Sequence, residues 1–127
     1  MEIAKRGIAA FNRGDVGAFA ALTTHDFEWY PSMGAIEGQA FLGREGIDKY
    51  FGNLDDAWEA FTILPGTYRD HAGTVVMLGR LEGRGKESGV PVDAPLGMVF
   101  DFRRGAISRI RGYLDHDDAL KAAGLAG

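Results

Sequence analysis

The chain has 127 residues, a net charge of −4, an apolar fraction of 46% and no cysteine. These values fit one soluble domain with no disulfide bond, no thiol chemistry and no cysteine-based zinc site. The negative charge argues against nucleic acid and anionic membranes as partners. No apolar run approaches the roughly 20 residues of a membrane helix, and the N-terminus lacks signal-peptide features, so we expect a cytoplasmic location.

Two helices are predicted at the start of the chain. Apolar residues recur at helical spacing from Ile3 to Phe11, and residues 12–14 end this helix. Asp15 can cap a second helix by accepting backbone N–H groups. Residues 23–26 are expected to end that helix.

A short strand over residues 27–30 should follow, stopped by Pro31. Residues 33–42 are glycine-rich and irregular. A third helix is predicted over about residues 44–60, since apolar side chains recur every three or four residues. This apolar stripe comprises Ile47, Tyr50, Phe51, Leu54 and Trp58.

From Phe61 onward the apolar period changes to two, which predicts strands. In the first, Phe61 and Ile63 alternate before Pro65–Gly66 and Tyr68 follows, and the others are expected over residues 74–84, 91–102 and 106–114. Asp115 or Asp117 can cap a final short helix. Helices followed by an antiparallel meander indicate an α+β fold, and a curved sheet closed by helices encloses a cavity suited to small ligands.

Four segments, in this order, resemble the SnoaL-like branch of the nuclear transport factor 2-like superfamily, which shares the ketosteroid isomerase-like fold. They are Asn12–Asp15, Phe27–Pro31, Gly43–Ile47, and the ending from Gly105 to Leu125. The resemblance implies one domain over residues 1–127, a conical barrel whose curved, mostly antiparallel sheet wraps around three N-terminal helices, with a short C-terminal helix. It also implies a hydrophobic pocket and a homodimer formed through the outer sheet face.

Acids used by known members of this superfamily are missing at the matching positions. Tyr30 stands where the resemblance places the base of steroid isomerases. Gly7 stands near one donor position, and Gly97 or Met98 near the other. Gly112 replaces the acid that SnoaL-type cyclases and limonene epoxide hydrolase carry on the last strand, which argues against all three reactions.

One part of the hydrolase pattern is present, because Arg80-Leu81-Glu82 resembles its Arg-x-Asp pair. Residues two apart on a strand share a face. Arg80 and Glu82 could therefore form a polar anchor in the cavity, with Glu82 as acid or base, or a solvated or interfacial ion pair outside it. Tyr30 is the preferred hydrogen-bond donor of the pocket, so these three are the candidate catalytic residues.

Candidate ligand contacts are Trp29, Met33, Leu78, Met98 and His71. Trp29 and Tyr30 point to opposite faces, so one of them enters the pocket or core. Methionines offer adaptable apolar surface, although core packing explains them equally well. His71 lies in a predicted turn, where histidines are usually solvated.

Arginines between residues 103 and 111 suggest either an anionic partner or an ion-paired outer face, and the nearby Asp101 and Asp115 favour the latter. The three histidines lack metal-ligand spacing, so we predict neither a metal nor a cofactor.

Three functions fit these observations. The first is an isomerase, cyclase or hydrolase that acts on a hydrophobic substrate through Glu82. The second is a non-catalytic ligand-binding or accessory protein. The third is a dimeric interaction module with a filled cone. A solvent-facing Glu82 would contradict the first, and a cavity too small for any ligand would favour the third.

Overall fold

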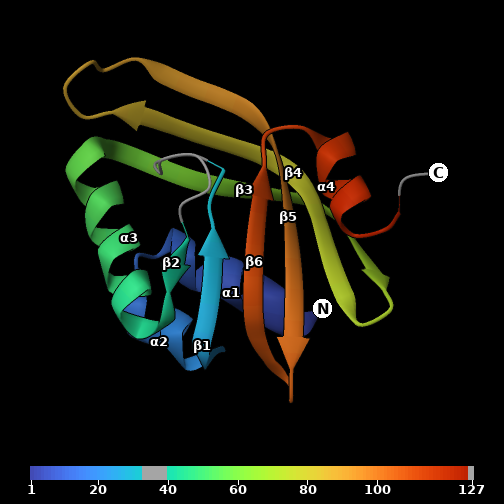
Figure 1. The fold of residues 1–127 in the computed structure, drawn as a ribbon. Helices are drawn as coiled ribbons and strands as arrows, with labels where there is room; N and C mark the ends of the chain where they lie inside the picture. The colour runs from blue at the N-terminus through green and yellow to red at the C-terminus, as the bar shows by residue number, and fades with distance from the viewer. Residues whose placement is uncertain (33–39, 126–127) are drawn as a thin grey trace.

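The computed structural model describes residues 1–32 and 40–125. Helices come first and a meander follows (Figure 1), which confirms the α+β class. The elements are α1 (Glu2–Asn12), α2 (Val16–Ala21), β1 (Thr23–Tyr30), β2 (Phe41–Leu42), α3 (Gly43–Ala57), β3 (Trp58–His71), β4 (Thr74–Gly85), β5 (Pro91–Arg103), β6 (Ala106–Tyr113) and α4 (His116–Ala122).

The strands form one sheet in the order β2-β1-β6-β5-β4-β3. The β1–β6 pair is parallel and the other pairs are antiparallel, so the sheet is mostly antiparallel, as expected. It curves around α1, α2 and α3, while α4 lies on the outer face (Figure 1). The two edges, β2 and β3, do not pair, and the cone is therefore open rather than a closed barrel.

A bulge between Pro65 and Thr67 bends the long β3–β4 hairpin, because bulges increase local twist. The strands approach closely there. A Cβ at Gly66 would lie 2.4 Å from the Leu78 carbonyl oxygen, and one at Gly79 would lie 2.3 Å from that of Leu64. Glycine at both positions therefore permits the bend.

Aspartate side chains cap the N-termini of two helices. Asp15 accepts a hydrogen bond from the Ala18 N–H at the start of α2, which confirms the predicted cap. At α4 the cap is Asp115, which accepts from the N–H groups of Asp117 and Asp118.

Several predicted boundaries are wrong. The second helix does end before Thr23, but β1 begins there rather than at Phe27, because pairing with β6 starts at Thr23. Phe41–Leu42, predicted to be irregular, forms β2. Trp58 opens β3 rather than extending α3, and its ring packs on Phe61 at 5.2 Å between centroids. β3 includes Pro65 and Gly66, because the bulge accommodates both residues without ending the strand.

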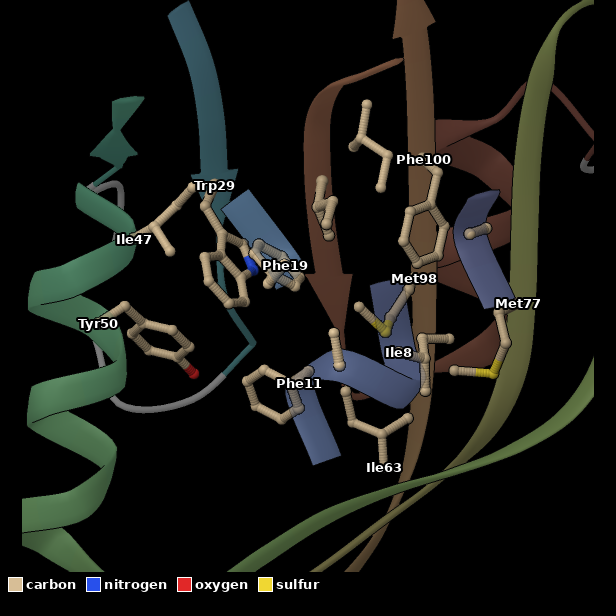
Figure 2. Close-up of a cluster of buried hydrophobic side chains, with 14 of the residues drawn as sticks. Ile8, Phe11, Phe19, Trp29, Ile47, Tyr50, Ile63, Met77, Met98 and Phe100 are labelled. Carbon is tan, nitrogen blue, oxygen red and sulfur yellow. The ribbon is translucent and has the colours of Figure 1, made fainter. Parts of the chain in front are cut away.

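The core inside the cone combines aliphatic side chains with an aromatic cluster around Trp29, which is 3% exposed (Figure 2). Its ring stacks on Phe19 at 4.9 Å and meets Tyr50 at 4.6 Å. A second, smaller cluster lies on the outer face, where Ala119 of α4 covers Val76 and Val99. Both faces of the central strands are therefore buried in part.

Asn12, the last residue of α1, is bound to edge strand β3. Its side-chain amide donates to the Ile63 carbonyl at 2.8 Å and accepts from the Ile63 N–H at 2.9 Å. The amide thus bonds to the backbone much as a neighbouring strand would, and it holds α1 against the open edge of the sheet.

Candidate functional site

A cavity opens inside the cone, between α1, α3 and the concave face of the sheet. The residues that line it are Phe11, Trp29, Pro31, Ser32, Tyr50, Phe61, Ile63, Leu81, Leu96, Met98, Ile110 and Gly112. Its volume is about 30 Å³, which is room for about one water molecule. Trp29 and Met98, two predicted ligand contacts, lie in this lining.

The side-chain hydroxyls in this lining belong to Tyr50 and Ser32. Figure 2 shows the Tyr50 hydroxyl pointing from α3 into the interior, toward Phe11. Burial raises the pKa of Tyr50, which is 3% exposed, far above its ordinary value. The phenol is therefore protonated at neutral pH and suited to a hydrogen bond rather than to proton abstraction.

Arg80 and Glu82 lie on the outer face of β4, which corrects the hypothesis that they line the cavity. Leu81 stands between them and enters the lining, so alternation turns both charged neighbours outward. Arg80 Nε donates to Asp93 Oδ1 at 2.9 Å, and both side chains are more than half exposed. Glu82 borders an open groove on this outer side.

Tyr30 also faces away from the cavity, because its neighbour Trp29 is the residue that points inward. Its hydroxyl donates to Glu28 Oε1 at 2.7 Å, and this bond raises the pKa of Tyr30. The structure therefore brings none of Arg80, Glu82 and Tyr30 into the cavity that they were expected to serve.

A model of the SnoaL-like domain matches residues 4–110. The chain belongs to this family. No curated protein matches it in sequence. The cone of helices and sheet described above is the fold that the resemblance implies.

Solved structures similar to this SnoaL-like domain include an NTF2-like protein of unknown function from Burkholderia pseudomallei. It has 16% identity and a TM-score of 0.82, and the match covers 97% of this chain and 95% of that protein. TerC, co-crystallized with polyporic acid, has 19% identity, a TM-score of 0.79, and 96% and 95% coverage. A putative polyketide cyclase from Xanthomonas campestris has 20% identity, a TM-score of 0.73, and 99% and 95% coverage. At these identities the likeness shows the fold alone.

Two of the positions at which this SnoaL-like domain lacks the acidic residues of the superfamily face the cavity. Gly112 and Met98 both belong to its lining, whereas Gly97 lies against Ala119 on the outer side. A Cβ at Gly112 would lie 2.8 Å from the backbone nitrogen of Ser32. The chain itself therefore occupies the space that an acidic side chain would need.

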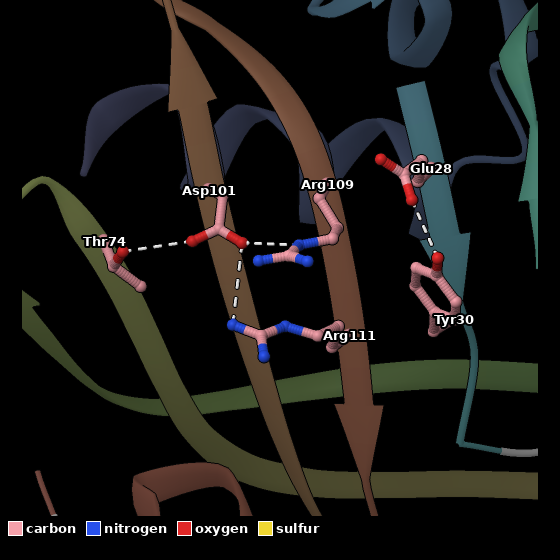
Figure 3. Close-up of polar contacts among 6 residues, drawn as sticks. All are labelled: Glu28, Tyr30, Thr74, Asp101, Arg109 and Arg111. Atoms are coloured by element: carbon pink, nitrogen blue, oxygen red, sulfur yellow. Dashed lines mark hydrogen bonds and ion pairs between the residues drawn. The ribbon is translucent and has the colours of Figure 1, made fainter. Parts of the chain in front are cut away.

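Polar contacts gather instead on the outer face of the sheet (Figure 3). Asp101 Oδ2 accepts from Arg109 Nε at 2.8 Å and lies 3.5 Å from Arg111 Nη2, and Asp101 Oδ1 accepts from Thr74 at 3.0 Å. The bond to Asp101 raises the pKa of Arg109. These contacts confirm the predicted ion-paired face.

The other candidates are spread over the molecule. Leu78 packs under α4 on the outer face, and His71 is exposed at the end of β3, so neither lines the cavity. Met33 lies outside the described residues. Within residues 1–32 and 40–125, no group of three or more histidine, aspartate or glutamate side chains could hold a metal, and no helix is long and apolar enough to cross a membrane.

Sequence reasoning missed Tyr50 as a site residue and placed it in the apolar stripe of the third helix. The stripe itself is correct, since Tyr50 is buried on the inner face of α3. The available signal was a phenol in a stripe of hydrocarbon side chains, because a buried tyrosine brings a polar group into the interior.

Proposed function

We propose that this SnoaL-like domain binds a small, mostly apolar molecule in the cone cavity. The observation that supports this most directly is the lining, in which apolar and aromatic side chains converge around the hydroxyl of Tyr50. Ligand sites commonly combine an apolar wall with a few placed polar groups. A ligand with one hydroxyl or carbonyl oxygen matches this composition best.

The proposed activity is binding without proton-transfer catalysis in the cavity. Isomerases, cyclases and hydrolases need a group that gives or takes a proton near neutral pH. The described lining contains no carboxylate, imidazole or amine, and the raised pKa of Tyr50 makes its phenol a poor base. TerC, co-crystallized with polyporic acid, supports ligand binding on this fold, whereas the putative polyketide cyclase represents the catalytic alternative.

Binding requires the cavity to widen, since ligand pockets commonly measure roughly 300–1,000 Å³ and this one measures about 30 Å³. Met98 is the side chain best suited to move, because methionine is unbranched and adaptable. A small flat phenol needs less widening than a steroid-sized molecule, and we therefore choose 4-bromophenol as the probe.

The chain has two tryptophans, and Trp29 lines the cavity whereas Trp58 does not. Protein labelled with 5-fluorotryptophan should therefore give two ¹⁹F resonances, which the Trp58→Phe variant assigns. We expect 4-bromophenol to shift the Trp29 resonance saturably, and more than that of Trp58. Met98→Ala should tighten binding by about tenfold, because the ligand no longer displaces that side chain.

The matched control is Leu78→Ala, which truncates a side chain on the opposite face of the same sheet. It should leave the affinity for 4-bromophenol unchanged. An unmoved Trp29 resonance in both the wild-type protein and Met98→Ala would exclude the cavity as a ligand site.

The small cavity volume favours a second candidate, a homodimeric interaction module that uses the outer sheet face. Arg111 lies on that face with its side chain 22% exposed and its Nη2 3.5 Å from Asp101 Oδ2, and a second copy could supply a further acceptor to the exposed part of the guanidinium. We expect sedimentation equilibrium to give a dimer that Arg111→Met weakens, whereas a monomer at every concentration would contradict a dimer.

A further inference from the structure

A second hollow, here called the side cleft, lies between the end of α1, the C-terminal half of α3 and the start of β3, three segments that Figure 1 locates. Its volume is about 210 Å³, several times that of the cone cavity. Phe11 and Phe61 border both spaces and form the wall between them. The side cleft therefore offers room that the cone cavity lacks.

Four aromatic side chains line the side cleft: Phe11, Phe51, Trp58 and Phe61. They form one contact series, with ring centroids 5.5 Å apart for Phe11–Phe51, 6.0 Å for Phe11–Phe61 and 5.2 Å for Trp58–Phe61. Aromatic rings attract organic cations through their quadrupole, and tryptophan does so most strongly. Phe11 and Phe51 are each only 7% exposed, so Trp58 and Phe61, which are partly buried, present the aromatic surface that suits a cation with an apolar surface.

The charged residues of the side cleft also favour a cation. Asp55 and Glu59 line it with exposed carboxylates, and neither carboxylate has an ion pair among the described residues. Arg13, the cation in the lining, already lies 3.7 Å from Asp15. The surplus of charge that faces the cleft is therefore negative.

The end of α3 adds to this negative potential, because a helix C-terminus carries partial negative charge. An ammonium group of the chain already lies there, since Lys86 Nζ donates to the Asp55 carbonyl at 2.8 Å. Lys86 is not among the residues that line the side cleft. Lys86 therefore offsets part of the charge at the helix end without entering the lining, and the carboxylates of Asp55 and Glu59 carry the attraction for a second cation.

The carboxylate of Asp55 lies at the C-terminal end of α3, where it lowers the stability of that helix. Asp55 and Asp56 fall in the last turn of α3, which has no basic residue, and acidic side chains at that end oppose the helix dipole. A cation bound in the cleft would offset this repulsion at Asp55.

We propose that the side cleft binds a small organic ammonium ion between its aromatic wall and the carboxylates of Asp55 and Glu59. The site is separate from the cone cavity, and its ligand class differs from the neutral apolar molecule proposed there. Choline fits as a probe because its trimethylammonium group combines positive charge with apolar surface.

The experiment titrates the 5-fluorotryptophan-labelled protein with choline, and separately with 3,3-dimethylbutan-1-ol, the uncharged analogue of the same shape, at constant ionic strength. Trp58 reports on the side cleft and Trp29 on the cone cavity. We expect choline to shift the Trp58 resonance saturably and more than that of Trp29. The neutral analogue should bind at least about tenfold more weakly, because it loses attraction to two carboxylates.

The double variant Asp55→Asn/Glu59→Gln should weaken choline binding by about tenfold. Asp55→Asn alone should weaken choline binding by a smaller factor, and Asp56→Asn is its matched control, since it removes one negative charge from the adjacent exposed residue, which does not line the cleft, and should leave choline affinity unchanged. Equal binding of choline and its neutral analogue, equal effects of the two single variants, or a shift confined to Trp29 would overturn the proposal. Because 4-bromophenol is read at Trp29, failure of the cavity and failure of the cleft remain distinguishable.

Discussion

Replacement of Trp29 by alanine is expected to lower the free energy of unfolding by about 3–5 kcal/mol, the usual loss for a large aromatic side chain deleted from a core. Trp29 is 3% exposed and its ring stacks on Phe19 and packs against Tyr50. The indole also contacts Phe11 and Phe51, so its deletion leaves a large cavity among several rings. Urea denaturation followed by circular dichroism measures the loss.

Tyr30 supplies the control for this prediction. Its hydroxyl bonds to Glu28 on the outer face, where the side chain is only half-buried. Tyr30→Phe should therefore cost no more than about 1 kcal/mol, the net value of one such hydrogen bond. A larger loss for Tyr30→Phe than for Trp29→Ala would mean that the faces of β1 have been assigned the wrong way round.

Replacement of Asn12 by alanine is expected to cost about 2–4 kcal/mol, although it removes only one small side chain. The change breaks two hydrogen bonds, of 2.8 and 2.9 Å, and leaves both backbone groups of Ile63 unpaired on an edge strand. Unpaired, poorly solvated backbone groups carry a desolvation penalty of roughly 1–3 kcal/mol each. Chemical denaturation measures this loss as well.

Asn53 is the matched control, since it is an exposed asparagine on α3 with no hydrogen bond beyond its own helix among the described residues. Asn53→Ala should change the stability by less than about 0.5 kcal/mol. Similar effects for Asn12→Ala and Asn53→Ala would show that the bond between α1 and β3 contributes nothing to stability.

The architecture was predictable because helical and strand periods separate cleanly along the chain. The sheet face on which Arg80 and Glu82 lie was not predictable, although the apolar Leu81 between them indicated that they point outward. Apolar residues alternate on the inner face at Val75, Met77 and Leu81, but Val76 and Leu78 are apolar as well. The structure supplies the reason, since α4 covers the outer face over Val76 and Leu78, and nothing in the sequence shows where α4 docks.

The same limit applies to the pair at the end of β1. Alternation establishes that Trp29 and Tyr30 face opposite sides, but either could be the inner one until the helices are placed. The resemblance favoured Tyr30 for the pocket, whereas α3 brings Tyr50 there, from a segment whose stripe pattern indicates only burial. Which side chains meet in the cavity depends on the packing of α1 and α3, and this packing has no local signature.

The central claim is that the concave, apolar side of the sheet holds the ligand site, and a crystal structure of Met98→Ala with 4-bromophenol tests it most directly. The bromine is located by its anomalous scattering. We predict a bromine peak inside the cone, beside Trp29 and Leu81, with the phenol oxygen within hydrogen-bond distance of the Tyr50 hydroxyl. Bromine found only on the outer face of the sheet, beside Arg80 and Glu82, would contradict the account.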